Sequence, residues 1–167
     1  TEPGVGSAVR GMKCAARQDG DEFIINGTTH FISHADAATF TILFAATGEE
    51  DTPRGKKKLI TAFLVDKGTK GFTVRDGYKN VSHRGYNNCI LEFTDCRLHK
   101  SQILGELHKG FEVANEWLWA TRLQVAATCI GRAERAMEHA KQYAVDRHQF
   151  GQQIGKFQGV SFKLADM

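Results

Sequence analysis

The first seven residues of the chain carry groups that could hold a flat or anionic ligand. Thr1 and Ser7 supply a hydroxyl group at each end of the segment, and Gly4 and Gly6 lie between them. A glycine lets backbone N–H groups approach a ligand closely, and a hydroxyl both donates and accepts hydrogen bonds. The same composition is also typical of ordinary surface turns. The segment therefore indicates binding only in combination with other segments, and the candidates are residues 31–33 and 147–151.

The composition excludes some classes of protein. The chain has 167 residues, of which 41% are apolar and 25% charged, as in soluble globular proteins. No window approaches about 18 uninterrupted apolar residues, so no membrane span is predicted. The net charge of +3 is too small to indicate nucleic-acid binding. The basic run at residues 54–58 closely follows acidic residues 49–51, which favours a solvated hairpin tip over a phosphate site.

The cysteines and histidines do not indicate a metal site. The chain has four cysteines without a C-x-x-C pair, and their apolar neighbours at Cys89 and Cys129 predict buried thiols in a reducing compartment. His30 and His34 are four residues apart. On a helix this spacing would present both rings to one metal ion, but their segment is predicted to be strand and loop. We interpret both histidines as polar surface or loop residues.

The sequence up to about residue 107 is typical of β-structure. Asn26-Gly27 favours the positive φ angles of a type I′ turn and predicts a hairpin of strands 21–25 and 28–33. Four more apolar runs, rich in β-branched and aromatic residues and separated by glycines, predict strands at residues 39–46, 59–65, 72–75 and 89–93. This spacing indicates a small antiparallel barrel or sandwich as a first domain, residues 1–107.

The remaining residues, 108–167, have helical periodicity. From Phe111 to Tyr143 apolar residues recur every three or four positions, which predicts one helix of roughly nine turns. A second helix is predicted from about Phe157 onward. A long apolar stripe requires a helical bundle to cover it, so we expect its partners beyond Met167 or on another subunit. The fold class is therefore α+β: a β domain followed by the first two helices of a helical bundle.

Several motifs in one order and spacing resemble those of the acyl-CoA dehydrogenases, a family of flavin enzymes. They include Thr1-Glu2-Pro3-x-x-Gly6-Ser7, Phe31-Ile32-Ser33, Thr121-Arg122, Arg147-x-x-Phe150-Gly151, Gln158 and Leu164-Ala165-Asp166-Met167. These motifs span the whole chain, and together they are far more specific than any one of them. The resemblance implies a truncated multi-domain flavoprotein that binds FAD.

In this family the first motifs face the flavin ring, which implies roles for five residues of this chain. Thr1 and Ser7 would hydrogen-bond the flavin edge and neighbouring substrate atoms, and Gly6 would let the backbone approach. Phe31 stands where the family has tryptophan, so the aromatic face is kept and the indole donor is lost. Ser33 would place a hydroxyl near the reactive nitrogen. If these residues do not contact a flavin, Ser7 would stabilise a turn, and Phe31 would be a core residue of a strand.

The helical motifs imply a second group of contacts. Arg147 would pair with the FAD diphosphate of a neighbouring subunit, since a guanidinium can bond two phosphate oxygens at once. Phe150 would lie near the adenosine part, and Gln158 would add a polar contact. Thr121 and Arg122, with Ser7, would line the substrate channel. The alternatives are a helix C-terminal cation for Arg147 and a structural ion pair for Arg122.

The resemblance also implies a reaction, a substrate and partners. The reaction is α,β-dehydrogenation of an acyl-CoA thioester, in which a carboxylate removes the α-proton and the β-hydride passes to the flavin. We expect the base to be a glutamate beyond Met167, because Thr121 occupies the family's alternative position. The chain alone is therefore expected to be inactive. The implied partners are a second subunit, in a homodimer or homotetramer that shares FAD across subunits, and electron-transfer flavoprotein. The implied compartment is the bacterial cytoplasm or the mitochondrial matrix.

Some positions depart from the family pattern and leave alternatives open. Ala8 replaces a usual aspartate, and Trp119 stands where an acidic residue is common. One alternative is a flavin oxidase or monooxygenase with the same fold, and a carboxylate at the downstream base position would favour dehydrogenation instead. The other is a non-catalytic β-domain that binds a protein or nucleic acid through a continuous basic or apolar patch.

Overall fold

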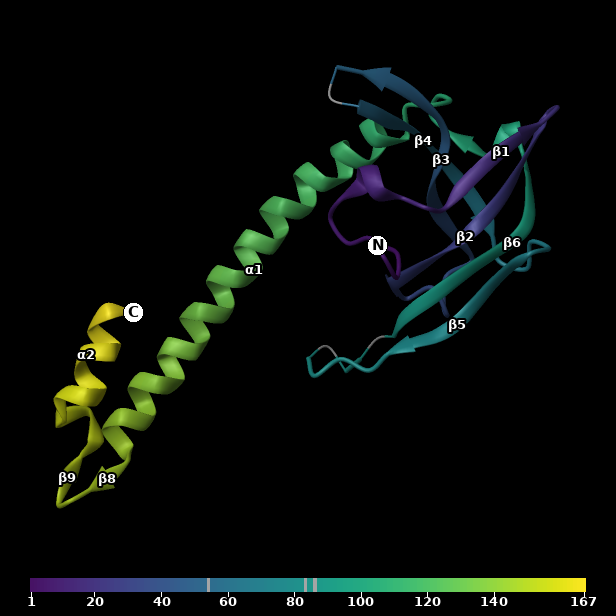
Figure 1. Cartoon of the computed structure of the whole chain (residues 1–167). Coiled ribbons are helices and arrows are strands. Elements are labelled where there is room, and N and C mark those ends of the chain that lie inside the picture. The colour runs from purple at the N-terminus through teal and green to yellow at the C-terminus, as the bar shows by residue number, and fades with distance from the viewer. Residues whose placement is uncertain (54, 83, 86) are drawn as a thin grey trace. The chain divides into compact units, whose positions relative to one another are not determined.

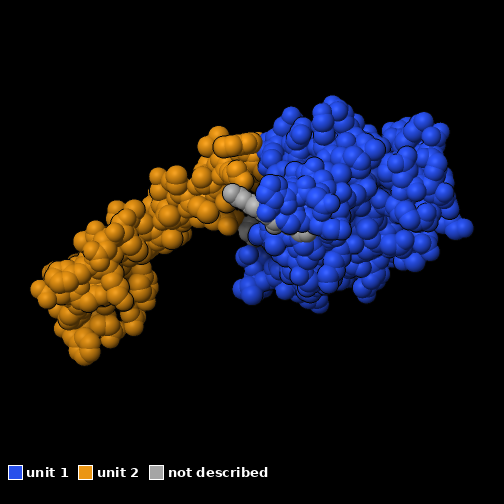
Figure 2. All heavy atoms as spheres, turned by 45° about the horizontal axis from the view of Figure 1, so that its top comes forward, with its two compact units in different colours: residues 1–116 blue, residues 117–167 orange. Residues whose placement is uncertain are grey.

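The computed structural model describes residues 1–53, 55–82, 84–85 and 87–167. The chain divides into two compact units, residues 1–116 and residues 117–167 (Figure 2). The first unit contains the β-structure, and helix α1 (Gly110–Asp146) begins in it and continues into the second unit. Among the described residues, no helix is both long and apolar enough to cross a membrane.

The first unit is built on one seven-stranded sheet that curls into a half-barrel (Figure 1). Its strand order is β5-β6-β2-β1-β3-β4-β7. The neighbours run antiparallel except β1 and β3, which are parallel and meet at Ala15 and Ala46. The strands are β1 (Ala15–Asp19), β2 (Glu22–Ser33), β3 (Phe40–Thr52), β4 (Gly55–Asp66), β5 (Phe72–Tyr78), β6 (Asn88–His99) and β7 (Ile103–Leu104). The predicted α+β class is confirmed.

Buried side chains from five strands form one core in this unit. Phe23 of β2 and Phe63 of β4 pack with their ring centroids 5.3 Å apart. Burial of such apolar side chains contributes on the order of 2 kcal/mol each to stability. The core also contains Cys14, Ala16, Ile25, Ala35, Leu43, Ala45, Val65, Cys89, Leu91, Phe93, Cys96 and Leu98.

The hairpin predicted at Asn26-Gly27 is wrong, because β2 runs straight through these residues. The turn lies at Gly20, whose φ of +63° suits the two-residue loop between β1 and β2. Asn26 instead spans a bulge in β6: its Oδ1 accepts the backbone N–H of Asp95 at 2.9 Å. A Cβ at Gly27 would lie 2.6 Å from the Cα of Cys14, so the glycine is required by close packing.

The acidic and basic runs form the tip of the β3–β4 hairpin, as the sequence predicts. Glu50 and Lys57 lie opposite each other and form an exposed ion pair of 2.7 Å. The charged residues belong to β3 and β4, so both strands extend well beyond the apolar runs from which the strand ends were predicted. Arg54, which belongs to the predicted basic run, lies outside the described residues.

The second unit contains most of α1 and a second helix, α2 (Gln158–Asp166), so both predicted helices are confirmed. A short hairpin of β8 (His148–Gln149) and β9 (Gln152–Gln153) connects them, followed by the 3₁₀ turn η3 (Ile154–Lys156). Phe150 and Gly151 form the hairpin turn, both with positive φ. The other short turns are η1 (Val9–Gly11) and η2 (Lys100–Gln102). Cys129 is exposed on α1, so the predicted burial of this thiol is wrong.

Candidate functional site

The N-terminal segment is held to the sheet by a buried carboxylate. Glu2 is 7% exposed, and its two carboxylate oxygens accept the backbone N–H groups of Lys13 at 2.7 Å and Cys14 at 2.9 Å. Hydrogen bonds to an ionised acceptor are about twice as strong as neutral ones. Beyond this anchor Ser7 is exposed, and a Cβ added to Gly6 would meet no atom within 4 Å. The segment is thus fixed at one end and open to a ligand at the other.

A backbone hydrogen bond joins the same segment to the end of β2. The N–H of His30 donates to the carbonyl oxygen of Thr1 at 2.9 Å. Phe31 and Ser33 follow within three residues. The structure therefore brings Thr1, Phe31 and Ser33, which were predicted from two separate motifs, into one neighbourhood of the first unit.

A bulge in β2 determines how this end of the strand presents its side chains. Between the pairs Thr29–Leu91 and Ile32–Cys89, β2 has one residue more than β6. Phe31 lies in the bulge with a φ of +57°, a conformation that costs a non-glycine residue about 1 kcal/mol or more. Bulges interrupt the alternation of a strand and turn a side chain toward another face.

His30 and Phe31 consequently lie in different environments. His30 is 9% exposed, whereas Phe31 is 47% exposed. His30 Nδ1 lies 3.0 Å from the hydroxyl oxygen of Tyr78, at hydrogen-bonding distance. The Tyr78 ring stacks on Phe31 with centroids 4.3 Å apart and planes inclined by 20°. The interpretation of His30 as a surface or loop residue is wrong, because His30 is buried in β2. Its backbone N–H bonds to Thr1, and its ring lies at hydrogen-bonding distance from Tyr78.

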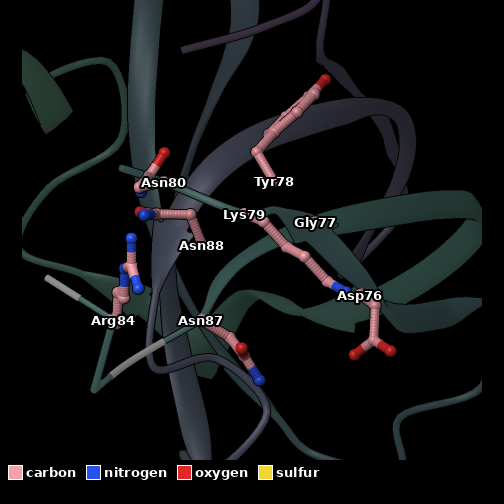
Figure 3. A pocket seen from close by; sticks show the side chains of 8 residues that line it. All are labelled: Asp76, Gly77, Tyr78, Lys79, Asn80, Arg84, Asn87 and Asn88. Atoms are coloured by element: carbon pink, nitrogen blue, oxygen red, sulfur yellow. The ribbon is translucent and has the colours of Figure 1, made fainter. Parts of the chain in front are cut away.

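Ser33 is hydrogen-bonded to a residue that lines a polar hollow, Asn88. Its hydroxyl donates to Oδ1 of the buried Asn88 at 3.3 Å. The hollow has a volume of about 550 Å³, and Figure 3 shows the side chains around it. It is lined by Asp76, Gly77, Tyr78, Lys79, Asn80, Arg84, Asn87 and Asn88. Amides and side chains of both charges thus surround it.

A neighbouring carboxylate is stabilised by one of these amides. Asn87 Nδ2 donates to Asp36 Oδ2 at 2.8 Å, and this hydrogen bond lowers the pKa of Asp36. The hydrogen bond thus favours the ionised form of Asp36. A second, more apolar hollow of about 220 Å³ is lined in part by Thr1, Ile32 and Leu91. Ile32 at the end of β2 thus lines an apolar space, while Asn88, the partner of Ser33, lines a polar one.

The predicted site residues of the second unit are all accessible except Thr121, which is half-buried. The backbone of Arg147 accepts a hydrogen bond from Ile154 at 2.8 Å, which closes the loop around the β8–β9 hairpin. Phe150, at the hairpin turn, is 92% exposed, and its ring lies edge-to-face with that of Phe157, with centroids 6.2 Å apart. Gln158 is the exposed first residue of α2. The exposed side chains of Arg147, Phe150 and Gln158 thus lie within one short stretch of sequence in this unit.

Thr121 and Arg122 make contacts within α1. The Thr121 hydroxyl donates to the carbonyl oxygen of Trp117 at 3.0 Å. The guanidinium of Arg122 lies over the Trp119 ring, 5.3 Å from its centroid, in cation–π contact. Trp119 is thus a contact of Arg122 at the position where the sequence departs from the family.

Sequence reasoning missed four residues of this site: Glu2, His30, Tyr78 and Asn88. Glu2 stands inside the motif Thr1-Glu2-Pro3-x-x-Gly6-Ser7, and this position was its only signal in the sequence. Tyr78 gave none, because its contact with Phe31 depends on bulges that have no clear sequence pattern. No group of three or more potential metal ligands is close together in the part of the chain that the structure describes.

Comparison with protein families agrees with this architecture. Residues 1–96 match the family model "Acyl-CoA dehydrogenase, middle domain", and residues 108–167 match "Acyl-CoA dehydrogenase, C-terminal domain". The chain belongs to the acyl-CoA dehydrogenase family.

Individual relatives cover the whole chain. It is 36% identical over 167 residues to the mitochondrial short-chain specific acyl-CoA dehydrogenase of Rattus norvegicus, of which it spans 40%. It superimposes on an acyl-CoA dehydrogenase from Geobacillus kaustophilus with a TM-score of 0.86 at 33% identity, covering 99% of this chain and 43% of that one. A glutaryl-CoA dehydrogenase from Mycobacterium smegmatis, solved in complex with FADH2, gives a TM-score of 0.82 at 29% identity, with 99% and 40% covered.

Proposed function

We propose that this chain forms part of an FAD-dependent acyl-CoA dehydrogenase, and that residues 1–33 supply the flavin-facing edge of its site. The observation that carries the proposal is the hydrogen bond between Thr1 and His30, which unites two motifs that are far apart in the sequence. Family membership supports the same reaction class. The proposal covers the whole protein, of which this chain is about two fifths by comparison with its relatives.

The residues present fit a flavin. A flavin ring is flat and apolar on its faces and carries hydrogen-bonding atoms along its edge. Phe31 offers a half-exposed aromatic face, and Thr1, Ser7 and Ser33 offer exposed residues with hydroxyl groups. Gly6 leaves the backbone open to close approach. Aromatic rings prefer offset-stacked or edge-to-face contacts, which an exposed ring such as Phe31 can make.

The second unit fits the other half of the cofactor. Arg147 carries the permanent positive charge and the paired N–H donors that suit a diphosphate. We propose that it binds FAD of a neighbouring subunit in a homodimer or homotetramer, with Phe150 against the adenosine and Gln158 as a polar contact. Phe150 is 92% exposed, so its ring is free to contact a ligand or a second subunit.

The chain's own residues orient the substrate, and do not supply the base. FAD held at this edge would supply a hydride acceptor for the β-carbon of an acyl thioester, whose α-proton a carboxylate would remove. We propose that Ser7, Thr121 and Arg122 line the path of the acyl-CoA. The carboxylate is proposed to be a glutamate after Met167. Electron-transfer flavoprotein is the proposed oxidant, in the bacterial cytoplasm or the mitochondrial matrix.

Spectroscopy of the full-length protein tests this proposal. The purified protein is expected to be yellow, with the absorption spectrum of oxidised flavin. Anaerobic addition of acyl-CoA thioesters should bleach that spectrum for at least one chain length. A colourless protein that binds no added FAD would overturn the proposal, and rapid oxygen consumption with hydrogen peroxide release would favour the oxidase alternative.

A further inference from the structure

Tyr78 reaches Phe31 because of a second bulge, in β5. Between the pairs Arg75–Ile90 and Tyr78–Asn88, β5 has one residue more than β6. Gly77 lies in this bulge, where an added Cβ would overlap the backbone carbonyl group of Asn88. The bulge therefore depends on a glycine at this position.

The two bulges lie on opposite sides of the same short stretch of β6. Strand β6 has β2 on one side and β5 on the other, and both irregularities fall opposite its residues 88–91. Each bulge re-aims an aromatic side chain, and the two rings stack although their strands are not neighbours. In Figure 3 the Tyr78 ring points away from the amide of Asn88. The stacking of Tyr78 on Phe31 thus depends on both bulges.

His30 holds Tyr78 from the buried side. Its Nδ1 lies 3.0 Å from the Tyr78 hydroxyl oxygen, and its ring centroid is 4.6 Å from that of Phe31. Its backbone N–H is bonded to Thr1. A buried residue with three such contacts has little freedom, so it fixes one end of Tyr78, although Tyr78 as a whole is 44% exposed.

We propose that Tyr78 is a positioning residue for the Phe31 ring. The proposal rests on the function proposed above, in which Phe31 lies beside the flavin. Phe31 is half-exposed, so without a neighbour its ring would sample several orientations. Stacking on a tyrosine that His30 anchors restricts the ring before the cofactor binds. Less conformational freedom is then lost on binding, and affinity rises.

The test uses full-length holoprotein with substitutions at Tyr78. Tyr78→Phe keeps the stack and removes the bond to His30, whereas Tyr78→Leu removes both. We expect the dissociation constant for FAD to rise about threefold to tenfold in Tyr78→Phe, the range of one lost hydrogen bond, and further in Tyr78→Leu. The visible flavin spectrum should shift in Tyr78→Leu.

Phe72→Leu is the matched control. Phe72 is on the same strand and stacks on Phe93 with centroids 4.9 Å apart, away from the site. Its loss should lower the thermal midpoint without changing FAD affinity or spectrum. If Phe72→Leu weakens FAD as much as Tyr78→Leu does at equal loss of stability, the positioning role is overturned.

A double substitution separates positioning from direct contact. If Tyr78 acts through Phe31, Tyr78→Phe should change FAD affinity less than about twofold in a Phe31→Leu background. If the two effects multiply, or if both Tyr78 variants bind FAD like the parent, Tyr78 does not position Phe31. A parent protein that binds no FAD would instead overturn the proposed function, so the two failures are distinct.

Discussion

The carboxylate of Glu2 accepts the backbone N–H of Cys14 at 2.9 Å, twelve residues along the chain. The same buried contact influences the thiol: burial, followed by the nearby charges of Glu2 and Cys96, raises the pKa of Cys14 to about 12. One carboxylate thus fixes the N-terminal segment to the residues just before β1 and adds to the effect of burial on the neighbouring thiol. The position of Thr1, and with it one edge of the proposed site, depends on this anchor.

Glu2→Gln is expected to lower the free energy of unfolding by about 1–3 kcal/mol. A glutamine offers one carbonyl oxygen where two backbone N–H groups need acceptors, so one of them stays unsatisfied. Equilibrium denaturation with urea measures the change. FAD affinity should fall as well, because Thr1 is released with the segment.

Glu116→Gln is the control for this substitution, since Glu116 is an exposed carboxylate of α1 in the same unit. It should change the unfolding free energy by less than about 0.5 kcal/mol. Equal effects of the two substitutions would mean that Glu2 contributes to stability only through its charge and not through its two hydrogen bonds.

The cysteines should differ sharply in reactivity. Cys14, Cys89 and Cys96 are buried, and burial raises the pKa of each thiol, whereas Cys129 is exposed. Only a thiolate reacts rapidly with an alkylating reagent. Iodoacetamide at pH 8 should therefore modify Cys129 of this chain first, as peptide mapping by mass spectrometry would show, and Cys129→Ser should abolish the fast phase. Labelling of Cys14 before Cys129 in the folded chain would contradict the structure.

The raised pKa of Cys14 also predicts a loss of stability in alkali. Above the ordinary thiol pKa of 9.0 the unfolded chain releases this proton, while the folded chain holds it up to about 12. The unfolded state then binds fewer protons, so the free energy of unfolding falls with rising pH, by about 1.4 kcal/mol per unit for this thiol. Cys14→Ala should reduce the slope between pH 9 and 10.5 by up to that amount. An unchanged slope would mean that the folded thiol titrates normally.

The misplaced hairpin shows where sequence reasoning fails for this fold. Asn26-Gly27 satisfies the local rule for a turn, but Asn26 bonds to Asp95 across the sheet and Gly27 packs on Cys14. Both partners are remote in sequence, so no local pattern reveals them. The helices were predictable because α1 repeats its apolar spacing over many turns, which is a local signal.

Gly27→Ala is expected to be strongly destabilising, by about 3 kcal/mol or more. The new Cβ would lie within 2.8 Å of three atoms of Cys14, and the φ of +154° disfavours a side chain. Gly131→Ala is the contrasting variant, because this helical glycine of α1 has open space around it. In the 167-residue chain it should stabilise by about 0.5–1 kcal/mol. Thermal unfolding of both variants compares them, and a mild effect of Gly27→Ala would show that the strand can shift at Cys14.

The candidate site was predictable only in part, for a related reason. Motifs pointed to Thr1, Phe31 and Ser33, which the structure brings together through one backbone hydrogen bond. Tyr78 was not predictable, because it joins Phe31 across an intervening strand through two bulges. Contacts set by register shifts depend on the packing of the whole sheet, and one sequence does not display them.

Arg147→Ala should separate cofactor binding from folding. The Arg147 side chain is exposed, while its backbone carbonyl, which a substitution leaves in place, accepts the bond from Ile154. We therefore expect the thermal midpoint of the apoprotein to change little. Loss of a charged hydrogen bond to a phosphate typically costs 10-fold or more in affinity, on the order of 1.5–3 kcal/mol, and FAD retention on gel filtration should fall accordingly. Arg135→Ala is the control, since Arg135 forms an exposed ion pair with Glu138 of the kind that contributes little. If Arg147→Ala reduces stability and FAD retention in parallel, the arginine serves the helix end instead of the cofactor.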